Sequence, residues 1–260
     1  MSTEKTEALV IRQTDFSETS KVVTLFTRDF GKVSALAKGA RRLKGPFEAA
    51  IDLLTACRIV FIRKSTDGLD ILTEAQVISR FRPNGRDLVR LYGGYYVAEL
   101  LNGLTEEYDP HPRLFDESLT TLKRLVEAPD PKLGPDPKLA PDPKLVIVRF
   151  ELAVLREIGQ LPAFDACVVC GRDSADDTTW AFWVSQGGLI CRDCQKERYE
   201  QNRVQAGTVA LLQRLSDESD AALERLVVSA EQLTQMRRVL TAAISNALGR
   251  RPSMTRYLNL

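Results

Sequence analysis

Two closely spaced pairs of cysteines constrain the fold of this 260-residue chain more than any other feature. The pairs read C-V-V-C and C-R-D-C, and residues 171–190 lie between them. Two residues between cysteines allow a tight turn to direct both sulfur atoms at one point, about 2.3 Å from a metal ion. Two such turns complete a tetrahedron. We therefore expect one structural zinc ion, bound by Cys167, Cys170, Cys191 and Cys194.

Other interpretations of these cysteines are four unliganded thiols or a redox-active pair. A redox C-x-x-C usually opens a helix beside a βαβ unit, and no such pattern surrounds either pair. Four thiolates also fill the coordination sphere of zinc, which leaves no position open for water or substrate and excludes a catalytic role. Residues 178–183 predict a short strand between the pairs, and Gly187 and Gly188 predict its turn, as in a small zinc ribbon.

Composition and motifs limit the possible functions. The 36 basic and 35 acidic residues leave a net charge of +1, so binding to nucleic acid has to come from local clusters of charge. The N-terminus lacks a secretory pattern and no apolar run approaches the roughly 20 residues that span a bilayer, which predicts a cytoplasmic protein with reduced thiols and no membrane partner. Only one histidine, His111, is present, and phosphate-loop and nucleophile motifs are missing, so we expect no enzymatic activity.

Hydrophobic periodicity predicts a small β-barrel in the first part of the chain. Short runs alternate polar and apolar positions, with close turns at Phe30-Gly31-Lys32 and Asp67-Gly68. Five such strands favour an OB-fold, although an SH3-like barrel would give a similar pattern. Cys57 lies in an apolar run and is interpreted as a buried hydrophobe. The predicted strands lie near 8–13, 20–28, 31–38, 55–63 and 69–78.

After Pro83 the spacing of apolar residues becomes helical. Residues 145–158 are apolar nearly all round, which predicts a central buried helix, and Ser229 and Gln232 have the spacing of a capping box before a helix over 230–248. We therefore expect an α+β multidomain chain, in which a zinc ribbon with four cysteine ligands is inserted into an all-α domain. The expected limits are 1–81 for the OB-fold, 82–162 and 198–260 for the helical domain, and 163–197 for the ribbon.

A tandem repeat, PDPKLGPDPKLAPDPKL, occupies residues 129–145. Its prolines lack the amide hydrogen that helices and sheets require, so the whole segment is predicted to be an extended, solvated loop. A proline-rich docking motif would have the same composition, but a neutral duplication in a surface loop is the preferred interpretation.

Charge is clustered at two places along the chain. Between Phe30 and Phe47 there is no acidic residue, and five unpaired cations on a strand end and a glycine-flanked loop suit contacts with phosphates. If all five meet single-stranded DNA, log affinity should change with log salt with a slope of about −3.5. Nearby aromatics could stack on bases, although most are expected in the core. The cations are Lys32, Lys38, Arg41, Arg42 and Lys44, and the aromatics are Phe16, Phe26, Phe30, Phe47 and Phe61.

A second stretch without acidic residues runs from Gln232 to the C-terminus. Its arginines could form a secondary contact with DNA or with a partner, although some are expected to pair within the fold. The candidates for contact are Arg250, Arg251 and Arg256.

Several of these stretches resemble the bacterial DNA repair protein family RecO. The most specific is Ala37-Lys38-Gly39-Ala40-Arg41-Arg42, and the cysteine pattern resembles that of zinc-bearing members. The tail differs from the family's basic-serine ending, since Met254-Thr255 follow Ser253. The other matching stretches are 7–12, 15–21, 25–27, 31–33 and 248–253, with Arg256.

The resemblance implies a recombination mediator that hydrolyses no nucleotide. Such a protein binds single- and double-stranded DNA, anneals complementary strands, acts with RecR, contacts the single-strand-binding protein and helps RecA to load in the RecF pathway. It would work at the nucleoid. By matching positions, Lys38, Arg41 and Arg42 would contact DNA, with Lys32 and Lys44 as neighbours.

Two other hypotheses remain at this point. An RNA-binding protein of the translation apparatus could combine an OB-fold and a zinc ribbon, but the helical domain and residues 37–42 count against it. A thiol oxidoreductase is disfavoured by the absence of a βαβ pattern around the cysteines.

Overall fold

The computed structural model describes residues 2–41, 47, 50–64, 68–83, 87–127, 142–176, 178–196, 203–216 and 228–258. The chain divides into two compact units, Met1–Val126 and Glu127–Leu260.

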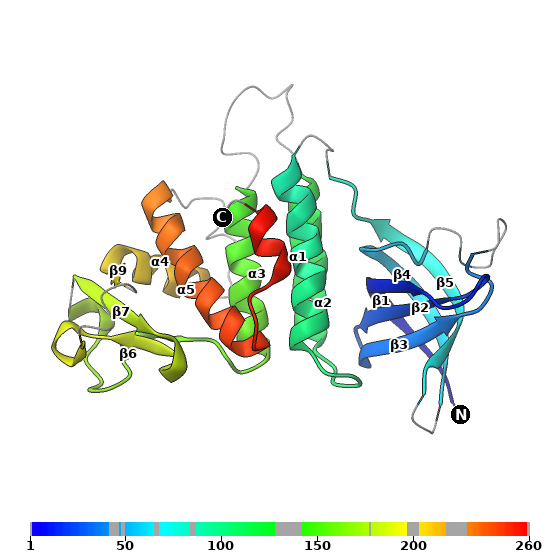
Figure 1. Ribbon diagram of the computed structural model, residues 1–260, viewed down its shortest axis with the longest axis horizontal. Helices are drawn as coiled ribbons and strands as arrows, with labels where there is room; N and C mark the ends of the chain where they lie inside the picture. Colours follow the sequence, from blue (N-terminus) through cyan, green and yellow to red (C-terminus); the bar gives the residue numbers. More distant parts are fainter. Residues whose placement is uncertain are drawn as a thin grey trace. The chain divides into compact units, whose positions relative to one another are not determined.

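The first unit begins with a closed five-stranded barrel (Figure 1). Its strands follow the order β1-β2-β3-β5-β4, in which β3 and β5 pair in parallel and the other neighbours are antiparallel. This is the predicted OB-fold, and the alternation of polar and apolar residues was sufficient to locate all five strands. The strands are β1 (Ser2–Asp15), β2 (Lys21–Thr27), β3 (Gly31–Ala37), β4 (Thr55–Arg63) and β5 (Asp70–Arg80).

Strand β3 illustrates how the barrel places its side chains. Val33 and Ala35 are buried, whereas Lys32 and Ser34 are partly exposed, because successive residues of a strand point to opposite faces. The predicted turn before β3 contains Gly31 at φ +67°, a conformation that favours glycine. A Cβ atom at Gly31 would also lie 2.1 Å from the carbonyl oxygen of Asp109, so a larger residue would displace the loop that packs there.

Among its described residues, the first unit also contains the helices α1 (Leu88–Leu104) and α2 (Pro112–Val126) (Figure 1). The ring of Phe115 in α2 lies 6.2 Å from that of Phe26 in β2, which joins the helix to the barrel through apolar contact. The loop between the helices returns to the barrel as well. There the Tyr108 amide donates to the Lys32 carbonyl oxygen at 3.0 Å, and the Tyr108 hydroxyl donates to Asp70. Burial and the hydrogen bond to Asp70 raise the pKa of Tyr108 well above its ordinary value.

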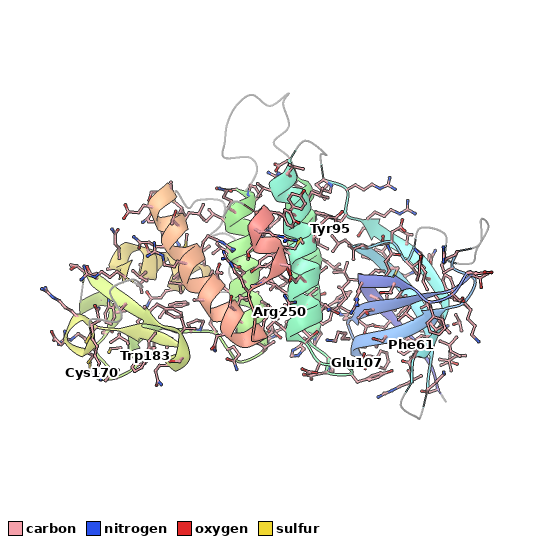
Figure 2. The ribbon with its side chains drawn as sticks, viewed as in Figure 1. Phe61, Tyr95, Glu107, Cys170, Trp183 and Arg250 are labelled. Carbon is pink, nitrogen blue, oxygen red and sulfur yellow. The ribbon has the colours of Figure 1, made fainter. Side chains whose placement is uncertain are left out.

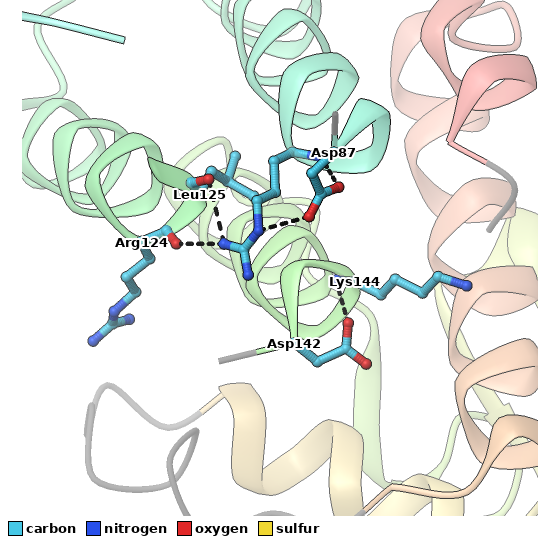
Figure 3. Close-up of polar contacts among 6 residues, drawn as sticks. Asp87, Arg124, Leu125, Asp142 and Lys144 are labelled. Carbon is cyan, nitrogen blue, oxygen red and sulfur yellow. Dashed lines mark hydrogen bonds and ion pairs between the residues drawn. The ribbon is translucent and has the colours of Figure 1, made fainter. Parts of the chain in front are cut away.

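A buried arginine connects the beginning of α1 to the end of α2 (Figure 3). Arg90 donates from Nε to Asp87 at 2.9 Å, and from Nη1 to the carbonyl oxygens of Arg124 and Leu125 at 3.2 and 3.3 Å. These carbonyls belong to the last turn of α2, where a helix lacks internal donors and a cation is favourable. Arg90 is therefore a structural residue.

In the part of the second unit that the structure describes, there are three α-helices and a small sheet of order β6-β8-β7-β9 (Figure 1). The sheet holds the cysteines, and its central strand β7 confirms the strand predicted over 178–183. The helices are α3 (Pro143–Glu157), α4 (Ala206–Ser216) and α5 (Ala230–Leu248). The strands are β6 (Ala163–Cys167), β7 (Thr179–Trp183), β8 (Gly188–Ile190) and β9 (Arg203–Gln205), and a 3-10 helix, η8, spans Ser253–Tyr257.

Helix α3 is buried from Leu145 to Leu155, as its composition predicted. The buried stretch includes Glu151, whose carboxylate accepts a hydrogen bond from Arg237 of α5. Helix α5 has the predicted limits and the predicted capping box, in which the Gln232 amide donates to Ser229 Oγ at 3.2 Å and the Ser229 amide donates to Gln232 Oε1 at 3.0 Å.

The prediction that the whole repeat 129–145 avoids helical structure is wrong at its end. Asp142 is the N-cap of α3, and its side chain accepts a hydrogen bond from the Lys144 amide at 2.8 Å (Figure 3). Pro143 begins the helix, because the first helical position needs no amide hydrogen. The remainder of the repeat, 129–141, lies outside the described residues.

Among the residues that the structure describes, none of the helices combines the length and the hydropathy that crossing a bilayer would require.

Candidate nucleic-acid interface and metal centre

Two loops of the barrel meet at one end because of the strand register. Asp15 pairs with Lys21 across β1 and β2, and Lys21 pairs with Ala37 across β2 and β3. The β1–β2 loop, residues 16–20, and the segment that follows β3, residues 38–41, therefore leave the barrel at the same end. Of the five predicted DNA-binding cations, Lys38 and Arg41 are described at this end.

Arg41 is held against the β1–β2 loop by three contacts. Its amide donates to the Thr19 carbonyl oxygen at 3.1 Å, and its Nη1 donates to the Ser17 carbonyl oxygen at 3.0 Å. Nη1 also lies 3.5 Å from Asp15 Oδ2, so Arg41 is not the unpaired cation that its acid-free sequence neighbourhood suggested. Its side chain remains 40% exposed, and Lys38 is exposed beside Gly39, whose φ is +76°. Both cations are thus exposed to solvent.

Lys32 does not join this group. It stands at the opposite end of β3, and six positions along an extended strand correspond to about 20 Å between Lys32 and Lys38. Its ammonium group donates to the carbonyl oxygens of Asn102 and Thr105 at the C-terminal end of α1. The other two predicted cations, Arg42 and Lys44, lie outside the described residues.

The aromatic candidates separate into core residues and one surface residue. Phe26, Phe47 and Phe61 are buried. Phe30 is partly buried, and its ring makes an edge-to-face contact with that of Phe61, with the ring centroids 5.5 Å apart. Phe16 is 61% exposed and stands on the β1–β2 loop, next to the loop that carries Arg41. Its polar neighbours Asp15 and Ser17, between two predicted strands, were the signal in the sequence that could have distinguished it.

The C-terminal arginines belong to the second unit. Arg250 donates to the Arg251 carbonyl oxygen at 3.4 Å, and the guanidinium carbon of Arg256 lies 4.6 Å from the centre of the Tyr257 ring. All three arginines are exposed. Arg237, from the same acid-free stretch, is buried with Glu151, which agrees with the expectation that some of these arginines pair within the fold.

The four cysteines converge as their spacing predicted. The four Sγ atoms all lie within 4.8 Å of one another, and those of Cys170 and Cys191 are 3.6 Å apart. Tetrahedral coordination with metal–sulfur bonds of about 2.3 Å requires sulfur atoms about 3.8 Å apart. The set can therefore hold one metal ion, and it fits a metal that prefers thiolates. Figure 2 labels Cys170 in this ribbon, together with Trp183 of β7. The four residues are Cys167, Cys170, Cys191 and Cys194.

Two tight turns produce this convergence. Cys167 ends β6, and the Gly171 amide donates back to its carbonyl oxygen at 2.9 Å with Gly171 at φ +75°. Cys191 follows β8, and the Cys194 amide donates to the Cys191 carbonyl oxygen at 3.1 Å. The Cys191 amide also donates to Cys167 Sγ at 3.3 Å.

The same geometry affects the ionisation of the thiols. Burial opposes the thiolate of Cys167, but backbone amides that donate to its sulfur lower its pKa to about 6. Hydrogen bonds among the sulfurs raise the pKa of Cys194 to about 12. A thiol binds a metal ion as the thiolate, so metal binding is expected to release the protons that now form hydrogen bonds between the sulfur atoms. Cys57, far from this cluster in the sequence, is buried in the barrel core, and burial raises its pKa to about 12.

Comparison with known proteins gives a consistent match along the chain. Residues 1–81 match the family model described as recombination protein O N terminal, and residues 85–256 match the model described as recombination protein O C terminal. A DNA repair protein RecO of Rhodopirellula baltica is 43% identical over 189 residues, which cover 72% of this chain and 66% of that protein. One of Anaeromyxobacter dehalogenans is 32% identical over 255 residues, covering 98% of this chain and 95% of that protein. One of Listeria monocytogenes is 32% identical over 197 residues, or 75% and 71% of the two chains.

Proposed function

Because the chain belongs to the RecO family of DNA repair and recombination proteins, we propose that it is a recombination mediator rather than an enzyme. In this role it binds single- and double-stranded DNA and anneals complementary strands. With RecR it helps RecA to load onto DNA covered by single-strand-binding protein, as part of the RecF pathway. Family membership favours this role over an RNA-binding protein of the translation apparatus.

The observation that carries the proposal is the pair of exposed cations at the loop end of the barrel. Lys38 and Arg41 are both exposed in the segment after β3, three positions apart, and Arg42 and Lys44 follow in the sequence. Cations that contact phosphates reduce the repulsion between two strands, so complementary bases can meet without covalent chemistry. Contacts to phosphates are also independent of sequence, which suits a protein that acts at any site of damage.

We assign Lys32 to the fold instead of to DNA. Its ammonium group is occupied by the carbonyl oxygens of Asn102 and Thr105 at the end of α1. Four cations then remain for phosphate contacts, and the slope of log affinity against log salt for single-stranded DNA should be about −2.8 instead of about −3.5. The C-terminal arginines Arg250, Arg251 and Arg256 remain candidates for a secondary contact with DNA or a partner.

The four cysteines are proposed to hold one structural zinc ion. Zinc prefers four thiolates in a tetrahedron, and the distances between the sulfur atoms fit this geometry. Residues 163–197 are then a zinc ribbon that stabilises its own part of the chain, between the helical segments 82–162 and 198–260. DNA binding is centred on the barrel, residues 1–81.

Substitution of the two exposed cations tests the proposal. Lys38→Gln and Arg41→Gln together should weaken binding to single- and double-stranded DNA and reduce the magnitude of the salt slope for single strands by about 1.4, because two phosphate contacts are lost. Fluorescence anisotropy over a salt series measures both quantities. Arg58→Gln is the matched control, since Arg58 is an exposed cation on β4 of the same barrel.

Equal affinity and equal slope in the double variant would place the DNA on another surface. A clear preference of the wild-type protein for RNA over DNA of the same sequence, or binding without salt dependence, would reject the mediator role itself. Thermal melting of each variant separates these outcomes from a loss of folding.

A further inference from the structure

Phe16 is an aromatic side chain that the fold leaves in water. At 61% it is the most exposed large hydrophobic side chain among the described residues. The barrel core is formed by other residues, including Phe47 and Phe61, so Phe16 makes no contribution to that cluster. A single exposed hydrophobic residue is common on a protein surface, and its setting has to decide whether it serves a ligand.

The setting of Phe16 is a loop with defined structure. The Phe16 amide donates to the Ser20 carbonyl oxygen at 3.0 Å, and the Ser17 amide donates to the same oxygen at 3.2 Å. The Ser20 amide donates back to Ser17 Oγ at 3.2 Å. These bonds hold the backbone that carries the exposed ring. A ligand that stacks on the ring would therefore cost the loop little freedom on binding.

Hydrogen bonds join the same loop to residues 38–41, the segment that follows β3. Arg41 donates to the carbonyl oxygens of both Ser17 and Thr19, so Arg41 and Phe16 belong to one hydrogen-bonded assembly of two loops. Lys38 begins the second of these loops, at the same end of the barrel. The exposed ring of Phe16 and the two cations therefore lie at the same end of the barrel.

Charge is partly balanced among the described residues of these two loops. Asp15 lies 3.5 Å from Arg41, and Glu18 is exposed on the same loop. These two carboxylates reduce the attraction that Lys38 and Arg41 exert on a phosphate chain. A contact that does not depend on charge would add to the affinity here, and the exposed ring can supply it.

We propose that Phe16 stacks on an unpaired base while Arg41 and Lys38 contact the neighbouring phosphates. This inference rests on the proposed function and deepens it, because it gives the barrel a means to prefer single strands. The bases of a duplex are already stacked on each other and offer no free face to a side chain, whereas every unpaired base does. When a complementary strand pairs with the bound one, the contact with Phe16 is lost, and the duplex product is held less tightly than the single strand was.

The experiment compares Phe16→Ala, Phe16→Tyr and Leu88→Ala with the wild-type full-length chain. Binding is measured by fluorescence anisotropy over a salt series, and affinities are compared at equal salt, for three probes of equal length: oligothymidine, an abasic oligonucleotide with the same phosphates, and a duplex. Leu88 is the matched control because it is also a strongly exposed apolar side chain, on α1 of the same unit.

Phe16→Ala should weaken binding of oligothymidine by about tenfold. It should leave the affinity for the abasic probe and for the duplex within about twofold of wild type, because neither offers a base for stacking. Phe16→Tyr should bind all three probes as wild type does, since tyrosine also stacks, and Leu88→Ala should change none of them. The salt slope of Phe16→Ala should equal that of wild type.

The proposal is overturned if Phe16→Ala binds oligothymidine as tightly as wild type, or if it loses affinity for all three probes to the same degree. Either result is distinct from failure of the proposed function, in which the wild-type chain itself would bind oligothymidine without salt dependence or would not bind it. Thermal melting of Phe16→Ala should be unchanged, because the side chain is not part of the core cluster.

Discussion

At the scale of single residues, Lys32 serves the fold of an element far from it in sequence. Its ammonium group donates to carbonyl oxygens at the end of α1, where the helix has no internal donors left and its dipole favours a positive charge. The Lys32 carbonyl oxygen in turn accepts from Tyr108, in the loop that follows α1. One residue thus connects β3 with the helical hairpin of the first unit.

This role gives Lys32 a test that separates it from the other cations. Lys32→Met should lower the free energy of unfolding by about 1–3 kcal/mol, because carbonyl groups at the end of α1 lose their partner. DNA affinity and the salt slope should stay close to wild type. Far-UV circular dichroism during urea unfolding measures the first effect, and anisotropy measures the second.

Lys38→Met is the matched control, since it removes an exposed ammonium group beyond the other end of the same strand. It should weaken DNA binding without changing stability. If Lys32→Met instead reduced the salt slope while the protein kept its full stability, Lys32 would be a DNA contact after all.

At the scale of elements, the ribbon is a sheet too small to form a large core. The strands of this sheet are short: β9 (Arg203–Gln205) has three residues and β6 (Ala163–Cys167) has five. The side chains of Trp180 and Leu189 are nevertheless buried in it. Small modules of this kind commonly need a metal or disulfides in addition to apolar contacts. The cysteines stand at the ends of β6 and β8, so one ion would join two strands and their turns.

Cys191→Ser should therefore release the metal. The zinc content, measured by atomic absorption, should fall from one ion per chain to nearly none, because a serine hydroxyl is a poor replacement for a buried thiolate. The two tryptophans, Trp180 and Trp183, both lie in β7, so their fluorescence reports unfolding of the ribbon specifically. Its midpoint in urea should decrease.

Cys57→Ala is the control for this substitution, since Cys57 is buried in the barrel core and distant in sequence from the ribbon. It should keep one zinc ion per chain. Loss of DNA affinity in Cys191→Ser, with the barrel still folded, would contradict a purely structural ribbon.

At the scale of the whole molecule, the chain separates its two chemical features between two compact units. The basic loops belong to Met1–Val126 and the cysteines to Glu127–Leu260. The units meet in sequence directly before the proline-rich repeat, which begins at residue 129. The repeat adds length to a connection, and the closure free energy of a connection depends only weakly on its length.

Deletion of one repeat unit, residues 129–134, should consequently have little effect. The free energy of unfolding should change by less than about 0.5 kcal/mol, and the affinity for single-stranded DNA should stay within about twofold of wild type. The deletion leaves Asp142 and Pro143, the cap and the first residue of α3, in place. A large loss of DNA affinity in a stable variant would favour a docking role for the repeat.

Much of the fold was determined by the sequence itself, because the relevant signals are local. Alternating residues located the five strands of the barrel, and Ser229 and Gln232 marked the start of α5. The spacing within each cysteine pair was sufficient to predict their convergence, since a short turn depends only on its own residues. The prediction for the end of the repeat was wrong because proline was treated alike at every position, whereas the first turn of a helix accepts it.

The roles of the individual surface residues depend on tertiary contacts. Lys32 and Lys38 are alike in sequence context, but Lys32 binds carbonyl oxygens at the end of α1 whereas Lys38 is exposed. Arg237 became an internal partner of Glu151, 86 positions away. Phe16 was distinguished from the other aromatics by exposure, which depends on what the rest of the chain covers. Such contacts join residues far apart in sequence, so their outcome is set by packing and not by local pattern.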